Sequence, residues 1–229
     1  MSNALDIYAK SEHLLGIEES TQILHSIFLT LLEDEQISSV LDIGCGRGGF
    51  MRHAKAAGIT CSGIDLSPVM VEAAQQNGLD VTCKNICEVT GCYEAAVAIF
   101  DVLNFIPPES LAPFFQCVAD VLKDDGLFIV DVNSEYGFSD VAEGSMSAED
   151  EYYFLNVNAV YDNEQLSTEF TLFHKQDNGS YLKSQECIEQ YFHSLETLRN
   201  NGALTLIEDH PLSLYDVDDK MLLIFQKKQ

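Results

Sequence analysis

The chain has 229 residues, enough for one substantial α/β domain with an embellishment. Its hydrophobic fraction of 46% is typical of a globular protein, and its apolar runs are far shorter than the ~20 residues of a membrane helix. Because 12 basic residues face 37 acidic ones, with a formal net charge of −25, nucleic acid is a poor partner. The N-terminus shows no signal peptide, so we expect a cytoplasmic protein with no membrane partner.

The first two thirds of the sequence alternate between predicted helices and short apolar strands. An amphipathic helix covers residues 18–33, and Ser67 with Pro68 marks the start of a later one. Ser110 is expected to cap another helix, which ends in a turn at residues 123–126. The predicted strands are residues 40–43, 60–64, 79–83, 95–100 and 127–132. Strands that alternate with helices predict a parallel sheet with right-handed crossovers.

The pattern changes after residue 148. Three segments rich in Tyr, Phe, Val and Thr are separated by turn sequences and predict an antiparallel meander. They are residues 152–161, 166–175 and 181–191. We therefore expect residues 148–191 to form an inserted β lid, and residues 1–147 and 192–229 to form the main domain.

Two final strands return to the main sheet. Ser194 is predicted to cap a helix that stops at Gly202. Residues 204–208 and 221–226 then predict an antiparallel hairpin at the sheet edge, which brings the sheet to seven strands.

The seven cysteines give no metal signal. Cys83, Cys87 and Cys92 form a C-x3-C-x4-C run that lacks the paired C-x2-C spacing of zinc sites and has no nearby histidine. Cys117 lies in an apolar stretch, where we expect a reduced thiol that packs as a small hydrophobe. We therefore predict no metal site.

A glycine-rich loop follows the first strand. Gly44, Gly46 and Gly49 satisfy G-x-G-x-x-G, a pattern that also occurs in nicotinamide and flavin enzymes. Asp42 lies two residues before the first glycine, where its carboxylate would repel a pyrophosphate but would suit a ligand with ammonium and sulfonium groups. Asp65 ends the second strand, where a carboxylate can bind both hydroxyls of a ribose. This second feature fits NAD and S-adenosylmethionine (SAM) equally.

Three sequence motifs resemble those of the class I SAM-dependent methyltransferases. Residues 40–50 resemble their first motif, and residues 63–67 (Gly-Ile-Asp-Leu-Ser) resemble their second. The turn at residues 123–126 (Lys-Asp-Asp-Gly) resembles the K-P-G-G turn before their fifth strand. The resemblance covers residues 40–132 and implies an α/β fold, namely a Rossmann-like, seven-stranded, mostly parallel sheet, here with an antiparallel β insertion.

The resemblance also implies roles for individual residues. Asp65 would hold the ribose hydroxyls, Leu66 would lie against the adenine, and Phe100 would border the methionine group. Tyr8 lies in a Tyr-Ala segment that often closes the cofactor site in one bacterial subgroup. The residues that would line the methionine part are Asp42, Gly44, Cys45 and Gly46, and those beside the adenine are Asn85 and Ile86.

The same bacterial subgroup suggests where an acceptor binds. Asn104, Asn133 and Tyr191 are substrate candidates, although Asn104 could equally cap a local turn. Asp131, Tyr191 and His193 are conceivable general bases, but their spacing selects none, so no catalytic residue is assigned. The predicted function is SAM-dependent methyl transfer to a small-molecule acceptor. The alternatives are an NAD(P)-dependent oxidoreductase and a non-catalytic SAM-binding protein.

Overall fold

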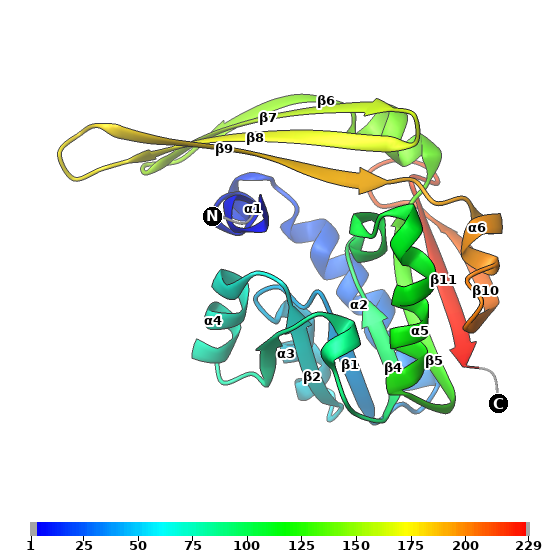
Figure 1. Cartoon of the computed structure of the whole chain (residues 1–229). Helices are drawn as coiled ribbons and strands as arrows, with labels where there is room; N and C mark the ends of the chain where they lie inside the picture. The colour runs from blue at the N-terminus through cyan, green and yellow to red at the C-terminus, as the bar shows by residue number, and fades with distance from the viewer. Residues whose placement is uncertain (1–3, 228–229) are drawn as a thin grey trace.

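The computed structural model of the chain describes residues 4–227 (Figure 1). Its main body is a seven-stranded sheet in the order β10-β11-β5-β4-β1-β2-β3. Five of its strands are parallel, and β11 runs antiparallel to both of its neighbours, β5 and β10. The strands are β1 Ser39–Ile43, β2 Thr60–Asp65, β3 Val81–Cys83, β4 Tyr93–Ala98, β5 Leu122–Asn133, β10 Leu204–Leu212 and β11 Lys220–Lys227. The predicted fold class is therefore confirmed, including the antiparallel hairpin at the edge.

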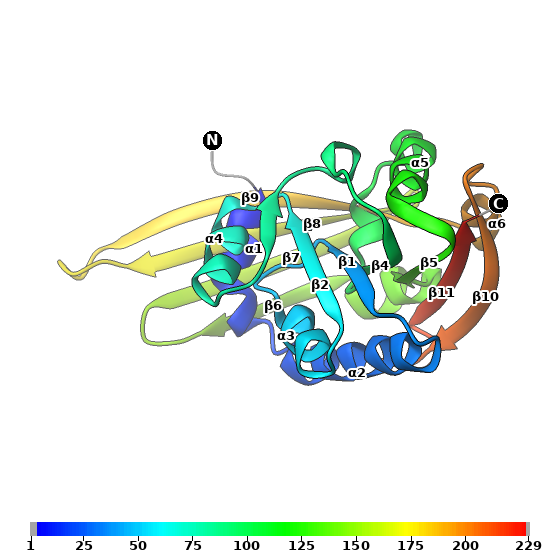
Figure 2. The same cartoon turned by 90° about the horizontal axis from the view of Figure 1, so that it is seen from below.

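Helices cover both faces of this sheet, as Figure 2 shows. One face packs against α2 and α3 through Leu24, Phe28 and Phe50, and the other packs against α5 and α6 through Phe115 and Leu198. Burial on both faces explains why β1 and β4 are almost continuously apolar. The helices are α1 Ala4–Ser11, α2 Glu18–Asp34, α3 Gly49–Ala56, α4 Pro68–Gln76, α5 Leu111–Val121 and α6 Leu195–Arg199.

Two of the three predicted helix caps are confirmed. Ser67 accepts a hydrogen bond from the Met70 N–H, and Ser194 accepts one from the Thr197 N–H. Ser110 makes no side-chain cap bond, so that prediction is wrong. Its backbone is already helical, because a 3₁₀ turn at Pro108–Ser110 leads directly into α5.

The insertion is a second, antiparallel sheet of four strands in the order β6-β7-β8-β9. The sequence predicted three of them and missed β6, whose side chains are mostly exposed and show no apolar alternation. The strands are β6 Gly144–Glu149, β7 Tyr153–Asp162, β8 Gln165–Lys175 and β9 Tyr181–Tyr191. This sheet lies across the top of the main domain in Figure 1, with α1 beneath it. Ile7 of α1 packs against Leu155, Phe170 and Ile188 of the inserted sheet.

Within residues 4–227, no helix combines the length and the hydropathy needed to cross a bilayer. The same residues contain no group of three or more His, Cys, Asp or Glu side chains arranged to hold a metal ion.

Candidate functional site

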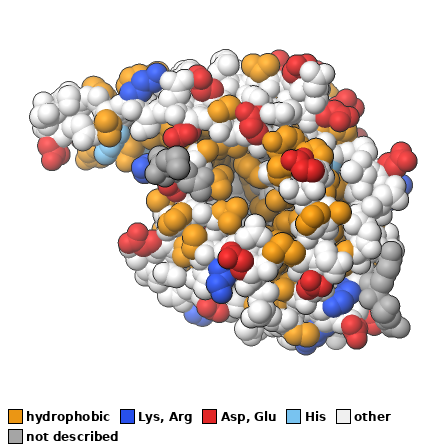
Figure 3. All heavy atoms as spheres, viewed as in Figure 1, with side chains coloured by type: hydrophobic (Ala, Val, Ile, Leu, Met, Phe, Trp, Pro, Cys, Tyr) orange, Lys and Arg blue, Asp and Glu red, His pale blue; other side chains and the backbone are white. Residues whose placement is uncertain are grey.

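A cavity of about 790 Å³ lies at the carboxyl ends of the parallel strands. Figure 3 shows the molecule hollowed beneath the inserted sheet, with hydrophobic side chains around the opening. This is the edge of an open α/β sheet at which ligands bind. All ten residues predicted to bind the cofactor line the cavity: Tyr8, Asp42, Gly44, Cys45, Gly46, Asp65, Leu66, Asn85, Ile86 and Phe100.

The glycine loop brings backbone close to this cavity. Gly44 has a φ of +74°, and a Cβ there would lie 2.7 Å from a methyl group of Val102. The Gly44 and Cys45 N–H groups both donate to the Ile64 carbonyl, which fixes the loop against β2. A larger residue at position 44 would therefore narrow the cavity and strain the turn.

Asp65 is held by backbone groups on both sides. Its carboxylate accepts hydrogen bonds from the Gly46 N–H at 2.9 Å and from the Ser67 N–H at 2.8 Å. Burial raises the pKa of Asp65, and these backbone donors act in the opposite direction. The side chain is thus pre-oriented at the end of β2.

Asp42 is a buried carboxylic acid in the cavity wall. Only 3% of the residue is exposed. Burial, followed by the nearby charge of Asp65, raises the pKa of Asp42 to about 8. A cationic ligand would favour the ionised form, whereas a pyrophosphate would oppose it. The wall therefore fits the positive groups of SAM better than a dinucleotide.

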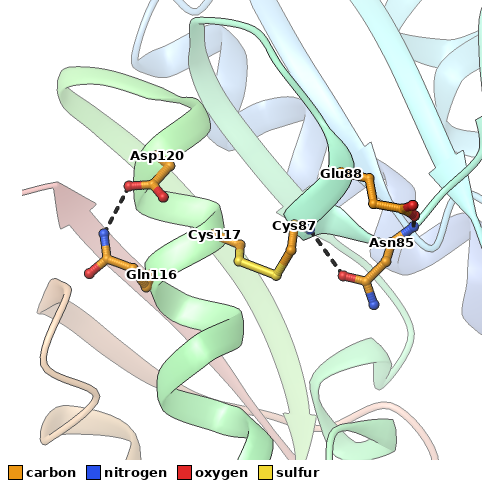
Figure 4. The surroundings of a disulfide bond; sticks show 6 residues. All are labelled: Asn85, Cys87, Glu88, Gln116, Cys117 and Asp120. Carbon is orange, nitrogen blue, oxygen red and sulfur yellow. Dashed lines mark hydrogen bonds between the residues drawn. A yellow bond between two sulfur atoms is a disulfide. The ribbon is translucent and has the colours of Figure 1, made fainter.

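The part of the cavity where the sequence predicts the adenine contains apolar side chains. Leu66 is 53% exposed although it is a large hydrophobic residue, and Ile86 lines the same cavity. Asn85 is engaged locally, since its side-chain oxygen accepts from the Cys87 N–H as part of a capping box with Glu88 (Figure 4). The carbonyl oxygen expected to meet the adenine amino group is therefore already in use.

Tyr8 enters the cavity from α1, and Arg47 ties that helix to the glycine loop. The Arg47 guanidinium donates to the Ala9 carbonyl at 2.7 Å and lies 3.5 Å from the Glu12 carboxylate. Burial raises the pKa of the Tyr8 hydroxyl. Arg47 carries no sequence signal for this role, because only the folded chain brings α1 over the loop.

Phe100 follows β4 in a left-handed conformation. Its φ is +71°, and that of the next residue, Asp101, is +66°. Such a backbone costs about 1–3 kcal/mol at a non-glycine residue and is characteristic of functional sites.

The three substrate candidates lie together, but outside the cavity. Asn104 is fully buried, its amide group donates to the Tyr191 carbonyl at 2.9 Å, and its side-chain oxygen accepts from the Asn133 N–H at 3.0 Å. The chain leaves the main sheet after Asn133, and Tyr191 is the last residue of the inserted sheet. Asn104 therefore bonds to one residue on each side of the insertion. These two hydrogen bonds give Asn104 a structural role, and its role as a substrate contact stays a prediction.

We expect Asn104→Ala to lower the free energy of unfolding by about 2 kcal/mol, since a buried side chain would be lost and two half-buried backbone groups would lose their hydrogen-bond partner. Denaturant unfolding measures this change. Asn77→Ala, at an exposed position on which the cavity does not depend, is the matched control and should change stability far less. Equal stability of the two variants would contradict this account of Asn104.

The other conceivable bases also lie away from the cavity. Asp131 is fully buried and accepts a 2.6 Å hydrogen bond from the Phe100 N–H. The His193 Nε2 atom lies 3.0 Å from the Ile106 carbonyl oxygen, and burial lowers the pKa of the ring. Both side chains are thus occupied by backbone groups of the surrounding turns.

A disulfide bond joins Cys87 and Cys117, so the expectation of a reduced thiol at Cys117 is wrong. Figure 4 shows that it links the short 3₁₀ helix Ile86–Glu88 to α5. The two cysteines are 30 residues apart, and only packing of this turn against α5 brings them together. The bond therefore anchors the cavity wall directly after Asn85 and Ile86.

The chain is similar to known methyltransferases. Residues 40–126 match a protein family described as a methyltransferase domain. A protein from Geobacillus sp. (strain WCH70) described as a methyltransferase is 25% identical over 169 residues, 69% of this chain and 68% of its own length. A SAM-dependent methyltransferase from Clostridium acetobutylicum has a TM-score of 0.80 at 19% identity, covering 99% of this chain and 100% of its own.

A sugar N-methyltransferase from Streptoalloteichus has a TM-score of 0.77 at 14% identity, covering 100% of this chain and 94% of its own. Likenesses at such low identity establish the fold. Together with the family match, they show that the chain has the fold of SAM-dependent methyltransferases and a methyltransferase domain within it. The match over residues 40–126 indicates that the protein is an enzyme with a methyltransferase domain.

Proposed function

We propose that the protein transfers the methyl group of SAM to a small-molecule acceptor held beneath the inserted sheet. The observation that carries this proposal is the cavity of about 790 Å³, which has the buried Asp42 and the half-buried Asp65 in its wall. Tyr8 of α1, the helix on which the insertion packs, also lines this cavity. Small-molecule sites commonly have volumes of about 300–1,000 Å³. The sugar N-methyltransferase named above supports an acceptor of this size.

The residues present fit the donor. We assign the methionine part to Asp42 and the loop Gly44–Gly46, the ribose to Asp65 and the adenine to Leu66 and Ile86. When bound, SAM supplies a methyl group activated by the positive sulfur. The protein contributes orientation and exclusion of water, which can account for several kcal/mol of rate enhancement without a catalytic side chain.

We propose that the insertion is the lid of the acceptor site. The sequence predicted it as residues 148–191, and β6 extends its start to Gly144. Its inner face packs on α1, and Tyr8 of that helix lines the cavity. The lid therefore acts on the cavity through α1. It is tied to the main domain at both ends by Asn104.

Calorimetric titration with S-adenosylhomocysteine, SAM and NADH tests this function. We expect micromolar binding of the first two ligands, and a loss of at least tenfold in affinity in Asp65→Ala, which removes the ribose contact. The control variant is Asp80→Ala, which removes an exposed carboxylate that accepts a hydrogen bond from the Ser62 hydroxyl. This variant should bind SAM and S-adenosylhomocysteine with wild-type affinity. Binding of NADH alone would show that the glycine loop serves a nicotinamide enzyme instead.

We also infer a cytoplasmic location from the sequence. Disulfides are rare in that compartment, so the Cys87–Cys117 bond makes the inference testable. Alkylation of thiols at the moment of cell lysis should label both residues if the protein resides in a reducing compartment. Complete protection of both would contradict the inference.

A further inference from the structure

The turn at Phe100 and Asp101 has an unfavourable backbone conformation, so other parts of the fold must stabilise it. Phe100 and Asp101 are consecutive left-handed residues, and neither is glycine. Phe100 lines the cavity, whereas Asp101 turns away from it toward the main sheet. A turn that is unfavourable in isolation persists only where its surroundings hold it.

Asp131 holds this turn from β5. One of its carboxylate oxygens accepts from the Phe100 N–H at 2.6 Å, and the other accepts from the Asp101 N–H at 3.3 Å. The residue is fully buried, so water does not compete for these bonds. The two successive N–H groups point to one carboxylate because both residues are left-handed.

Lys220 supports Asp131 in turn. Its ammonium group donates to Asp131 at 3.2 Å and to the Asp101 carboxylate, and the residue is 1% exposed. The same ammonium lies 5.5 Å from the centre of the Phe100 ring. Lys220 is the first residue of β11, so the strand inserted between β5 and β10 supplies the cation.

We propose that Asp131 and Lys220 are positioning residues of the methyl-donor site, which act by fixing the Phe100–Asp101 turn against the methionine part of SAM. This proposal rests on the proposed function only in placing that part of SAM beside Phe100. Neither residue lines the cavity, so each acts through Phe100. The competing explanation is that the three charged groups only satisfy one another in the interior and stabilise the fold.

The first variant is Asp131→Asn, which keeps the shape of the side chain but leaves one acceptor oxygen for the two backbone N–H groups. We expect its affinity for S-adenosylhomocysteine to fall at least tenfold while unfolding stays cooperative. Asp219→Asn is the matched control, because Asp219 is a buried carboxylate that also accepts from two backbone N–H groups, those of Leu214 and Tyr215. It should lose stability with less than a threefold change in affinity.

The second variant separates positioning from charge burial. Asp101→Asn, Asp131→Leu and Lys220→Met together remove all three charges, so that no buried ion remains unpaired. We expect this triple variant to melt closer to the wild type than Asp131→Asn does, but to bind S-adenosylhomocysteine as weakly as that single variant. Recovery of affinity along with stability would overturn the proposal, and so would wild-type affinity in Asp131→Asn. Failure of the wild type itself to bind would instead overturn the proposed function.

Discussion

Removing the disulfide by Cys87→Ser with Cys117→Ala is expected to lower the free energy of unfolding by about 3–4 kcal/mol. The bond closes a loop across a sequence separation of 30 residues, and without it the unfolded chain gains conformational freedom. Guanidinium unfolding under non-reducing conditions measures the difference. Addition of dithiothreitol should bring the wild type to the stability of the double variant.

Cys83→Ser is the matched control for this prediction. Cys83 is an exposed free cysteine four residues before Cys87, so its replacement should leave stability nearly unchanged. Hydrogen exchange adds a local test, because residues 85–89 lose their anchor to α5 in the double variant and should exchange faster. An unchanged free energy of unfolding after reduction would show that the disulfide bond does not stabilise the protein.

The elements that the sequence predicted correctly are those with a local signal. Ser67 and Pro68 mark a helix start on their own, and the apolar runs of β1 and β4 reflect burial on both faces. Strand β6 has no such signal, because it lies at the edge of the insertion with exposed side chains. Ser110 failed as a cap because the preceding 3₁₀ turn, which depends on packing, had already begun the helix.

The same distinction applies to the candidate site, where residues with a local signal were predicted and residues that depend on distant partners were not. Asp42 and Asp65 could be predicted because carboxyl ends of parallel strands always meet at one edge, whatever the rest of the chain does. Arg47, Asn104 and Asp131 could not be assigned correctly, since each derives its role from a partner 29 or more residues away. The sequence identified the residues that line the cavity better than those that hold these residues in place.

The raised pKa of Asp42 gives the last prediction, which concerns proton release. In the free protein this pKa is about 8, well above that of an ordinary aspartate, so Asp42 is mostly protonated at pH 7. An unfolded aspartate has a pKa of 3.8, so the folded state becomes less stable relative to the unfolded state as the pH rises from about 4 to about 8. A cationic ligand acts in the opposite direction, because it binds the ionised carboxylate. Binding of SAM or S-adenosylhomocysteine should therefore expel a proton.

Between pH 6 and pH 7 the ionised fraction of Asp42 rises about tenfold, and the affinity for S-adenosylhomocysteine should rise with it. Titrations at pH 7 in two buffers of different ionisation enthalpy should show the release of nearly one proton. Asp42→Asn should remove both effects. All other ionisable groups are the same in both proteins, so only the difference between the two proteins reports on Asp42. If the two proteins show the same pH dependence, Asp42 is already ionised in the free enzyme, and the positive groups of SAM are recognised elsewhere.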